Sequence, residues 1–575
     1  MNKLLILFIT CFPFSGFTQT NITSTNSVAE QIMLGNYSPA SYVSSTIIND
    51  HDSIIRGINN RVNPDSLKAY IYHLATFQNR NTGSDTISPL TGIGAARKWV
   101  YNKFQQISMD NDNRLVVSYL QFNQQICNIN QHQNIFAVLP GTDTVDNKII
   151  IIEGHLDSRC SGVCDTNCLA QGIEDNASGT ALVIELARIM SKYTYKNTIV
   201  FMATVGEEQG LYGANAFAQY ATNKGIQIEA VLNNDVIGGI ICGQTSSPPS
   251  CPGLNDIDSL QVRLFSYGGF NSRHKQLARF IKLQYQEELL QQVAVPMDIT
   301  IMSAEDRTGR GGDHIPFRQF NFPAMRFTSA NEHGDASNGP GYTDRQHTSG
   351  DIIGIDVTGD SIIDSFYVDF NYLSRNSVIN GVGAAMAAIG PLSPDLNLSV
   401  VNGPGLVVTI TNQTQYPQYR IAVRTVTNDW DSVYTTNTLT DTIYPPFSNI
   451  YFVSVASVDS LGIESLFSRE VLITPTGINE PDKTSVPFEL LQNRPNPFDE
   501  ATIIGVKVNN PSEYKEAYIL VRDIQGKIVK QLPINLNDEI NEVVYEHGYG
   551  NVGIYTYSLI VDGKIVTTKQ MVFAN

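Results

Sequence analysis

Between residues 63 and 390, continuous apolar runs alternate along the chain with segments whose apolar residues recur at helical spacing. Four of these runs are IFAVLPG, KIIIIEGHLDS, TIVFMATVGEE and IEAVLNNDVIG. Unbroken apolar strands are typical of a parallel or mixed sheet that is buried on both faces under helices. Segments such as PDSLKAYIYHLATF and ASGTALVIELARIMSKY predict the covering helices. The pattern therefore predicts an α/β domain with a mixed, mostly parallel sheet between helices.

The regions on either side of this domain have different patterns. Residues 19–62 are polar and irregular, which indicates an N-terminal extension or pro-segment. Residues 391–476 carry short alternating runs such as LVVTITN and IYFVSVASVD, with turn residues between them, and predict a small β-sandwich. Residues 477–487 predict a linker, and the β-rich residues 488–575 predict a second small sandwich. We thus expect two small all-β sandwich domains after the α/β domain.

The N-terminus, MNKLLILFITCFPFSGFTQT, combines Lys3 with a short apolar run and the small residues Gly16 and Thr18. This pattern predicts a secretory signal peptide over residues 1–18. A membrane anchor is the alternative, but the run is shorter than the ~20 residues that a span needs, and no later stretch is long enough. The formal net charge is −17 without a basic cluster, which disfavours nucleic acid and anionic membranes as partners.

Six cysteines remain after the predicted signal peptide: Cys127, Cys160, Cys164, Cys168, Cys242 and Cys251. An even number in an exported chain favours disulfides. Cys242 and Cys251 enclose a short loop, and we predict that they pair. The three closely spaced cysteines between residues 160 and 168 could form a metal cluster. Disulfides among them and with Cys127 are the interpretation that we favour.

Histidine and carboxylate residues occur where the predicted strands end. The second run ends in His155 and Asp157, the third in Glu207 and Glu208, and the fourth in Asp235. In open α/β sheets, ligands bind beyond the carboxyl ends of the strands. The sequence therefore predicts that these side chains converge at one edge of the sheet.

Two further motifs add to this group of side chains. GIEDNASG places Asp175 just ahead of a predicted helix, and QHTSGD supplies His347 and Asp351. Histidine and carboxylate ligands without thiolates suit zinc or a neighbouring divalent metal. Two histidines and several carboxylates exceed the needs of one ion, and suit two ions roughly 3.5–4 Å apart that share a carboxylate and a water.

Five motifs, HLDS, EDNASG, GEEQGLYG, NNDVIG and HTSGD, occur in the order and approximate spacing of the two-zinc aminopeptidases. Over residues 63–390 the chain resembles the secreted bacterial leucyl aminopeptidases and aminopeptidase Y. The resemblance implies a phosphorylase/hydrolase-like zinc exopeptidase fold. It also implies a secreted enzyme that hydrolyses the N-terminal peptide bond of peptides with a free N-terminus.

The resemblance assigns ligands for two Zn²⁺ ions. Asp175 and a water or hydroxide are expected to bridge the two ions. His155 and Asp235 are expected to complete the first zinc site, and Glu208 and His347 the second.

Five further residues receive supporting or competing roles. Glu207 resembles the general base that takes a proton from the bridging water and passes it to the leaving amine. Asp157 is similar to the carboxylate that orients a histidine ligand. Asp351 is expected to position the His347 loop. Asp313, beside His314, has either a supporting role near the pocket or a packing role. His333 is the weaker competitor of His347, because no aspartate follows it four residues later.

The two C-terminal regions also resemble known domains. Residues 391–476 are similar to a fibronectin type III domain. In residues 488–575, NRPNPF, LVRDIQGKIVKQL and GIYTYSLIVDG resemble the type A C-terminal sorting domain of the type IX secretion system, with Gly526 and Lys527 at a hairpin turn. The type IX machinery is then an expected partner. The expected route leads through the periplasm and across the outer membrane, to a secreted or surface-attached product.

Two other functions fit parts of the sequence. A glutaminyl-peptide cyclase uses the same scaffold, usually with one zinc, and such relatives tend to carry a tryptophan shortly after the glutamate pair. This chain has only Trp99 and Trp430, which favours the peptidase. A non-catalytic surface-binding protein would be expected to have lost a ligand, and none is missing from the motifs.

Overall fold

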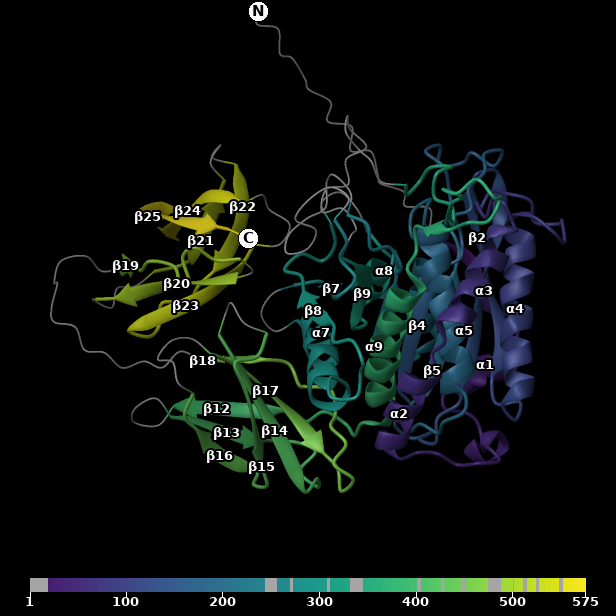
Figure 1. Ribbon diagram of the computed structural model, residues 1–575. Coiled ribbons are helices and arrows are strands. Elements are labelled where there is room, and N and C mark those ends of the chain that lie inside the picture. Colours follow the sequence, from purple (N-terminus) through teal and green to yellow (C-terminus); the bar gives the residue numbers. More distant parts are fainter. Residues whose placement is uncertain are drawn as a thin grey trace, which may run out of the picture.

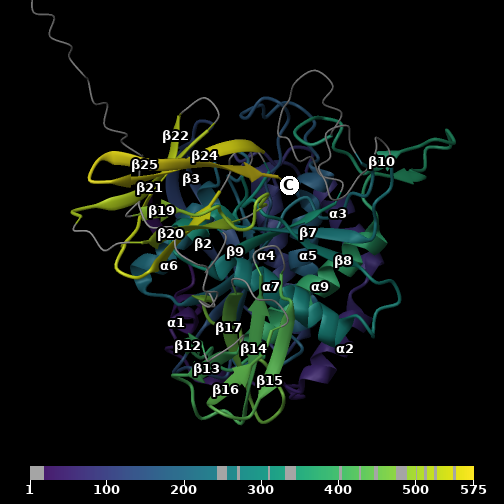
Figure 2. The ribbon, with the colours of Figure 1, turned by 90° about the vertical axis from the view of Figure 1, so that its left-hand side faces the viewer.

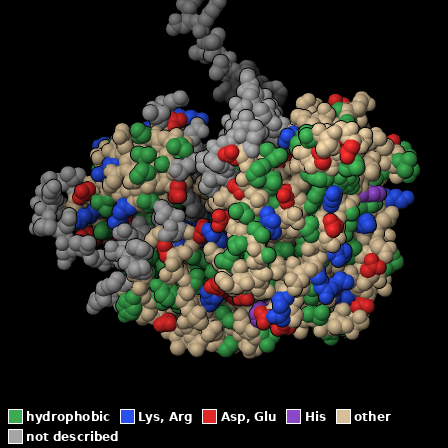
Figure 3. Space-filling view, viewed as in Figure 1, with side chains coloured by type: hydrophobic (Ala, Val, Ile, Leu, Met, Phe, Trp, Pro, Cys, Tyr) green, Lys and Arg blue, Asp and Glu red, His purple; other side chains and the backbone are tan. Residues whose placement is uncertain are grey.

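The computed structural model describes residues 19–574 except 243–255, 269–271, 308–310, 331–344, 401–404, 426–428, 446–450, 474–487, 500, 510–513, 524–526 and 548–551. The predicted signal peptide and linker lie outside the described residues, as do Cys251, His333 and Gly526. No helix among the described residues is long and apolar enough to cross a membrane. On the face in Figure 3, acidic and basic side chains are interspersed.

A nine-stranded mixed sheet forms the centre of the largest domain. In spatial order its strands are β1 (Thr20–Ser24), β2 (Val116–Ile126), β3 (Ile129–Leu139), β5 (Thr198–Thr204), β4 (Ile149–His155), β6 (Ile228–Asn234), β9 (Ala324–Ser329), β7 (Gln261–Ser266) and β8 (Asp298–Ile301). The central strands β5, β4, β6 and β9 are parallel, and antiparallel pairs extend the sheet on both sides. This confirms the mixed α/β sheet.

Helices cover both faces of this sheet (Figure 1). They are α1 (Ser27–Met33), α2 (His51–Arg61), α3 (Pro64–Ala75), α4 (Gly92–Asp110), α5 (Ser178–Met190), α6 (Tyr212–Lys224), α7 (Arg273–Gln284), α8 (His314–Gln319) and α9 (Phe370–Ile389). Short turns of other helix types lie at η1 (Pro39–Tyr42), η2 (Ile173–Ala177) and η3 (Tyr285–Leu289). Nearly all of α5 is buried, because it packs against β4 and α9. Its continuous apolar sequence suits that central position.

The expectation of an irregular segment over residues 19–62 is wrong. β1 pairs with β2 at the sheet edge, and the apolar side chains of α1 and α2 belong to the domain core. Asn26 and Asp50 cap the two helices by accepting backbone N–H bonds. Only three isoleucines of α2 are buried, Ile54, Ile55 and Ile58. The polar residues around them obscure the helical pattern in the sequence.

Two small β-sandwiches follow the α/β domain and lie on the same side of it (Figures 1 and 2). One sheet of the first sandwich contains β12 (Leu396–Val400), β13 (Leu406–Ile410) and β16 (Thr440–Ile443). Its other sheet contains β15 (Ser432–Thr436), β14 (Gln418–Arg424), β17 (Tyr451–Val458) and β18 (Val471–Ile473). One sheet of the second sandwich contains β19 (Phe488–Leu490), β20 (Ala501–Val508) and β23 (Ile540–Glu546). Its other sheet contains β22 (Ile528–Pro533), β21 (Ala517–Arg522), β24 (Gly553–Val561) and β25 (Lys564–Phe573). Each sandwich has its own apolar core drawn from both sheets. The two predicted all-β regions are therefore confirmed as sandwiches.

The first sandwich is docked on the α/β domain through buried contacts with α7. Glu470 accepts hydrogen bonds from Arg424 at 2.6 and 2.9 Å, and its carboxylate also pairs with Arg279 of α7 at 3.4 Å. All three side chains are almost fully buried. Ala456 and Phe467 of the sandwich join the apolar core of the α/β domain. The two domains thus share one packed interface.

Candidate metal centre

The predicted site residues meet where three parallel strands end. His155 is the last residue of β4, Glu207 and Glu208 follow β5, and Asp235 follows β6. Asp175 belongs to η2, the turn that leads into α5. Because β5, β4 and β6 are parallel neighbours, their carboxyl ends lie at one edge of the sheet. The sequence-based expectation of convergence there agrees with the structure.

One group of side chains surrounds His155. Its Nε2 lies 3.1 Å from Asp175 Oδ1, 3.4 Å from Asp235 Oδ1 and 3.9 Å from Glu207 Oε2. His155 is completely buried, and Asp175 and Asp235 are nearly so. His155 Nδ1 is 3.0 Å from the backbone carbonyl of Asp157. A proton on Nδ1 would therefore be held by that carbonyl, which leaves Nε2 free to bind a metal.

A second group surrounds His347. Its Nε2 lies 3.0 Å from Asp175 Oδ2 and 3.2 Å from Glu208 Oε2. Asp175 therefore directs one carboxylate oxygen to each histidine. The potential ligand atoms of His155, Glu207 and Asp235 lie within 4.8 Å of one another, as do those of Asp175, Glu208 and His347.

A single buried carboxylate holds the turn that carries the two adjacent glutamates. Asp157 Oδ1 accepts the backbone N–H of Glu207 at 3.3 Å, and Oδ2 accepts that of Glu208 at 3.2 Å. Gly206 precedes them at φ +77°, a left-handed conformation that glycine adopts without strain. The Asp157 carboxylate also lies 3.7 Å from His155 Nδ1, so the expectation that it orients His155 stays a prediction. Its direct hydrogen bonds go to the glutamate turn.

Asp351 plays the same part for the Asp175 turn. Its Oδ1 accepts the backbone N–H of Glu174 at 2.9 Å, and Oδ2 accepts that of Asp175 at 3.0 Å. Asp351 comes four residues after His347. The His347 loop and the Asp175 turn are therefore tied together, which is compatible with the predicted positioning role.

Burial and crowding shift the ionisation of these groups. Burial raises the pKa of Glu207 well above its usual value, and the charges of Asp235 and Glu208 add to this while His155 opposes it. Burial works against protonation of His155, yet the carboxylates around it, Glu207 foremost, raise its pKa well above the ordinary range. Burial also opposes ionisation of Asp175, but hydrogen bonds from both histidines hold its pKa well below the usual value. So many buried carboxylates favour a site for cations.

Three arginines near the site were missed by the sequence analysis. Arg80 is fully buried and donates to the backbone carbonyls of Leu156 at 2.8 Å and Gly172 at 2.9 Å. Arg326 of β9 lies 3.2 Å from Asp235 Oδ2. Arg159 Nε donates to Glu208 Oε2, in the group around His347, at 2.7 Å. No sequence motif marks these arginines, since they come from separate elements and act through contacts formed only in the fold.

Asp313 lies fully buried at the start of α8, where Thr204 Oγ1 donates to its Oδ2. Burial raises its pKa to about 7, against the opposing influence of His155. Neighbouring His314 directs Nε2 to the backbone carbonyl of Glu305 at 2.9 Å. Neither residue belongs to the two ligand groups.

The ligand groups face a cavity of about 400 Å³. Its wall also includes Arg159, Val163, Gln209, Gly210, Leu211, Arg307 and Gly311. Two disulfides fasten the loop on one side of the cavity, Cys127–Cys164 and Cys160–Cys168. They confirm the disulfide interpretation of these four cysteines over a thiolate cluster. Cys242 is also disulfide-bonded, and its predicted partner lies outside the described residues.

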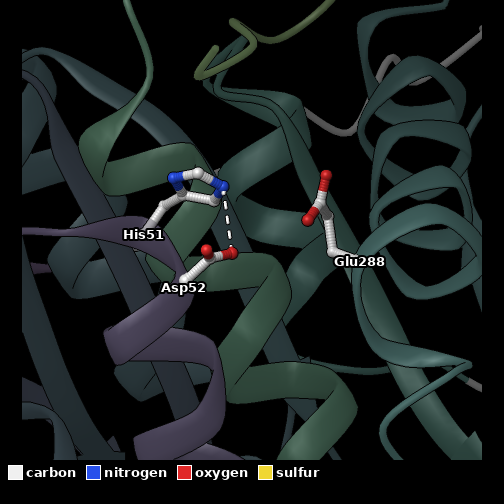
Figure 4. A group of neighbouring side chains, drawn as sticks. All are labelled: His51, Asp52 and Glu288. Carbon is white, nitrogen blue, oxygen red and sulfur yellow. Dashed lines mark ion pairs between the residues drawn. The ribbon is translucent and has the colours of Figure 1, made fainter. Parts of the chain in front are cut away.

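Another group of potential ligands lies away from the cavity, near the surface. Figure 4 shows His51 and Asp52 facing one another, with Glu288 of η3 across from them. Asp52 is 53% exposed and stands in the first turn of α2. The helix dipole is enough to stabilise an acidic side chain in that position, without a bound ion. We therefore assign no ion to this group.

The chain is similar in sequence to a known peptidase family. The profile of peptidase family M28 matches residues 134–362. A protein of Pyrenophora tritici-repentis described as a probable zinc metalloprotease is 31% identical over 357 residues, which cover 60% of this chain and 78% of the relative. The chain belongs to peptidase family M28. It is a metallopeptidase.

Two further proteins are similar to this M28 peptidase. A protein of Leptosphaeria maculans, also described as a probable zinc metalloprotease, is 29% identical over 389 residues, which cover 65% of this chain and 86% of the relative. The crystal structure of the LapA aminopeptidase of Legionella pneumophila aligns with a TM-score of 0.42 and 19% identity. That alignment covers 60% of this chain and 77% of LapA.

The donor set of this M28 peptidase fits zinc. It consists of imidazole nitrogens and carboxylate oxygens, which zinc accepts readily. Glu208 Oε1 is buried and has no hydrogen-bond partner among the described residues. A buried carboxylate oxygen without a partner is costly, and a metal ion would supply one.

Proposed function

We propose that this M28 peptidase is an aminopeptidase with a two-zinc centre, which removes the N-terminal residue from peptides. Asp175 carries the proposal. Its two carboxylate oxygens face the Nε2 atoms of His155 and His347, at 3.1 and 3.0 Å. A carboxylate directed to two separate ligand groups has the arrangement of a bridging ligand.

The remaining ligands divide between the two groups. His155 and Asp235 would hold one ion with Asp175, and Glu208 and His347 would hold the other. Bound zinc would supply a water of lowered pKa and polarise the scissile carbonyl. The chain's own contribution is to hold five ligand side chains rigidly at the edge of the sheet.

Glu207 is the proposed general base. It follows Gly206 on the turn that Asp157 holds, and its Oε2 is 3.9 Å from His155 Nε2. Its side chain is 12% exposed and lines the cavity. It can therefore take a proton from a water at the ligand groups and deliver it to the leaving amine. The neighbouring Glu208 is directed to His347, so the adjacent glutamates have separate tasks.

The cavity suits a substrate with a free amine. Three of the carboxylates that line it, those of Asp175, Glu208 and Asp235, would be occupied by zinc, which leaves that of Glu207. A free amine would be held by Glu207 and by a zinc ion. Acetylation would remove this interaction. We therefore expect the enzyme to cleave only the first peptide bond.

The test uses the secreted protein with and without a chelator. Peptides that begin with Leu, Ala, Lys or Gln, and one N-acetylated peptide, are followed by mass, with Glu207→Gln as the matched variant. We expect chelator-sensitive release of the first residue, no cleavage of the acetylated peptide, and a loss of at least 10²-fold in Glu207→Gln. Loss of ammonia from the Gln peptide without cleavage would instead indicate a cyclase. Internal cleavage or no turnover would contradict the proposal.

We also propose export by a signal peptide, with a fibronectin type III-like domain and a type IX sorting domain after the catalytic domain. In the second sandwich, Phe498 of the NRPNPF motif is buried, and its N–H donates to the backbone carbonyl of Val572 at 3.0 Å. Asn493 is also buried, and its backbone N–H donates to the hydroxyl of Tyr557 at 2.8 Å. Fractionation of cells that produce the full chain or a chain ending at residue 487 tests this. The shortened chain should accumulate in the periplasm, and equal export of both would contradict a sorting role.

A further inference from the structure

Arg159 lies directly against the second ligand group. Its Nε donates to Glu208 Oε2 at 2.7 Å, and its Nη2 lies 2.7 Å from His347 Nδ1. Glu208 is 2% exposed and Arg159 only 15% exposed. Short contacts with a charged donor in such a sheltered place are strong. One guanidinium therefore engages two of the proposed zinc ligands at once.

The contact with His347 has a consequence for ligation. A guanidinium can only donate hydrogen bonds, so the contact is favourable only when Nδ1 carries a lone pair. A neutral ring then carries its proton on Nε2, the nitrogen that faces Asp175 and Glu208. Metal binding through Nε2 needs the opposite tautomer, with the proton on Nδ1. The Arg159 contact and ligation by His347 thus exclude each other.

The contact with Glu208 acts in the same direction. A metal ion at this group and the Arg159 guanidinium are both cations, and both are attracted by the same carboxylate. Their mutual repulsion in a sheltered site is larger than in bulk water. An ion on Oε1 of Glu208, which is unpaired among the described residues, would still be repelled by the guanidinium on Oε2, so Arg159 weakens cation binding at this group.

The loop keeps Arg159 close to the ligands. Cys160, the next residue, is joined to Cys168, and Cys164 is joined to Cys127 at the end of β2. Arg159 Nη1 also donates to the carbonyl of Cys160 at 3.3 Å. The disulfides thus hold the backbone of Arg159 beside the site. The effective concentration of its guanidinium at the ligand group is therefore high.

We propose that Arg159 is a built-in competitor of the second zinc ion, an inference that rests on the proposed two-zinc centre. It lowers the affinity of the Asp175, Glu208 and His347 group for Zn²⁺. The group around His155 and Asp235 has no contact with Arg159 in the described structure, and it binds its ion first. Because a charge-assisted hydrogen bond is worth about 1.5–3 kcal/mol, removing Arg159 should tighten the second site by roughly tenfold to a hundredfold.

The experiment measures Zn²⁺ binding to the full chain after chelator treatment, by titration against a chromophoric chelator. Wild type is compared with Arg159→Gln and with Arg307→Gln. Arg307 is the matched control, because it lines the same cavity but pairs with Asp306 at 3.1 Å. We expect two sequential equivalents in wild type, a selectively tighter second equivalent in Arg159→Gln, and a smaller change in Arg307→Gln.

A second measurement gives a readout independent of the titration. The rise in Tm upon Zn²⁺ addition should be larger for Arg159→Gln than for wild type, since zinc stabilises by its affinity for the folded chain. Equal second-site affinities in wild type and Arg159→Gln would overturn the role of Arg159, and so would equal tightening in both variants. Either result would leave the proposed two-zinc centre intact. A single equivalent in every protein would overturn the two-zinc centre and the inference with it.

Discussion

Replacing Asp157 by asparagine tests how the glutamate pair is held. The substitution keeps the shape of the side chain but replaces one acceptor oxygen by an NH₂ group. The structure shows both oxygens in use, at 3.3 Å from the Glu207 N–H and 3.2 Å from the Glu208 N–H. In the variant, one of these buried N–H groups faces another donor.

The magnitude follows from the lost bond. A hydrogen bond to a charged acceptor contributes about 1.5–3 kcal/mol. The lost bond holds the general base Glu207 and the proposed zinc ligand Glu208 in place. If the full free energy of that bond is lost from transition-state stabilisation, kcat/KM should decrease by roughly tenfold to a hundredfold. The assay measures kcat/KM on a Leu-initiated peptide, together with the zinc content of each protein.

Asp369→Asn provides the matched control for this substitution. Asp369 caps α9, where it accepts one backbone N–H, from Tyr372 at 2.7 Å. The amide oxygen of asparagine can replace that single bond, so this variant should keep wild-type kcat/KM. If Asp157→Asn also stays within twofold of wild type with full zinc content, the Asp157 carboxylate does not set the position of the glutamates and our reasoning is refuted.

Three further predictions concern stability. Removal of metal by a chelator should lower Tm, because the buried carboxylates lose their counter-ions; an unchanged Tm in a calorimetric scan would speak against a buried ion. Burial raises the pKa of Glu464 to about 8 against the opposing charge of Arg420, so the folded chain keeps a proton that the unfolded chain loses near pH 4.5. Stability should therefore fall as the pH rises from about 4.5 to 8, by up to about 1.4 kcal/mol per pH unit. Glu464→Gln should flatten this fall in urea unfolding at pH 5 and pH 8, and an identical slope would contradict the assignment. Replacing Cys160 and Cys168 by serine should cost about 2–3 kcal/mol of unfolding free energy, and a denaturation midpoint equal to wild type would contradict a stabilising disulfide.

Strand ends made the ligand groups predictable from the sequence. His155, Asp235 and the glutamate pair each follow a buried apolar run, and parallel strands bring such positions together. The tasks of the supporting residues were harder to foresee. The bonds of Asp157 depend on the conformation of a turn, which apolar periodicity does not report.

The arginines and the N-terminal segment show where sequence patterns carry too little information. Arg80 reaches Leu156 from 76 residues upstream, and a single long polar side chain has no periodic signature. Helix α2 presents three isoleucines to the core among polar neighbours, so its apolar face is too narrow to stand out. In both cases the decisive partner is distant in the chain.

The docking of the first sandwich on α7 bears on how this enzyme could be shortened. A protein that ends after α9 would expose Phe467's partners in the core and deprive Arg279 of its pairing with Glu470. Breaking a buried ion pair in this way costs several kcal/mol. A minimal soluble enzyme should therefore extend through β18, and the smallest unit that evolution can duplicate or transplant comprises the α/β domain and this sandwich together.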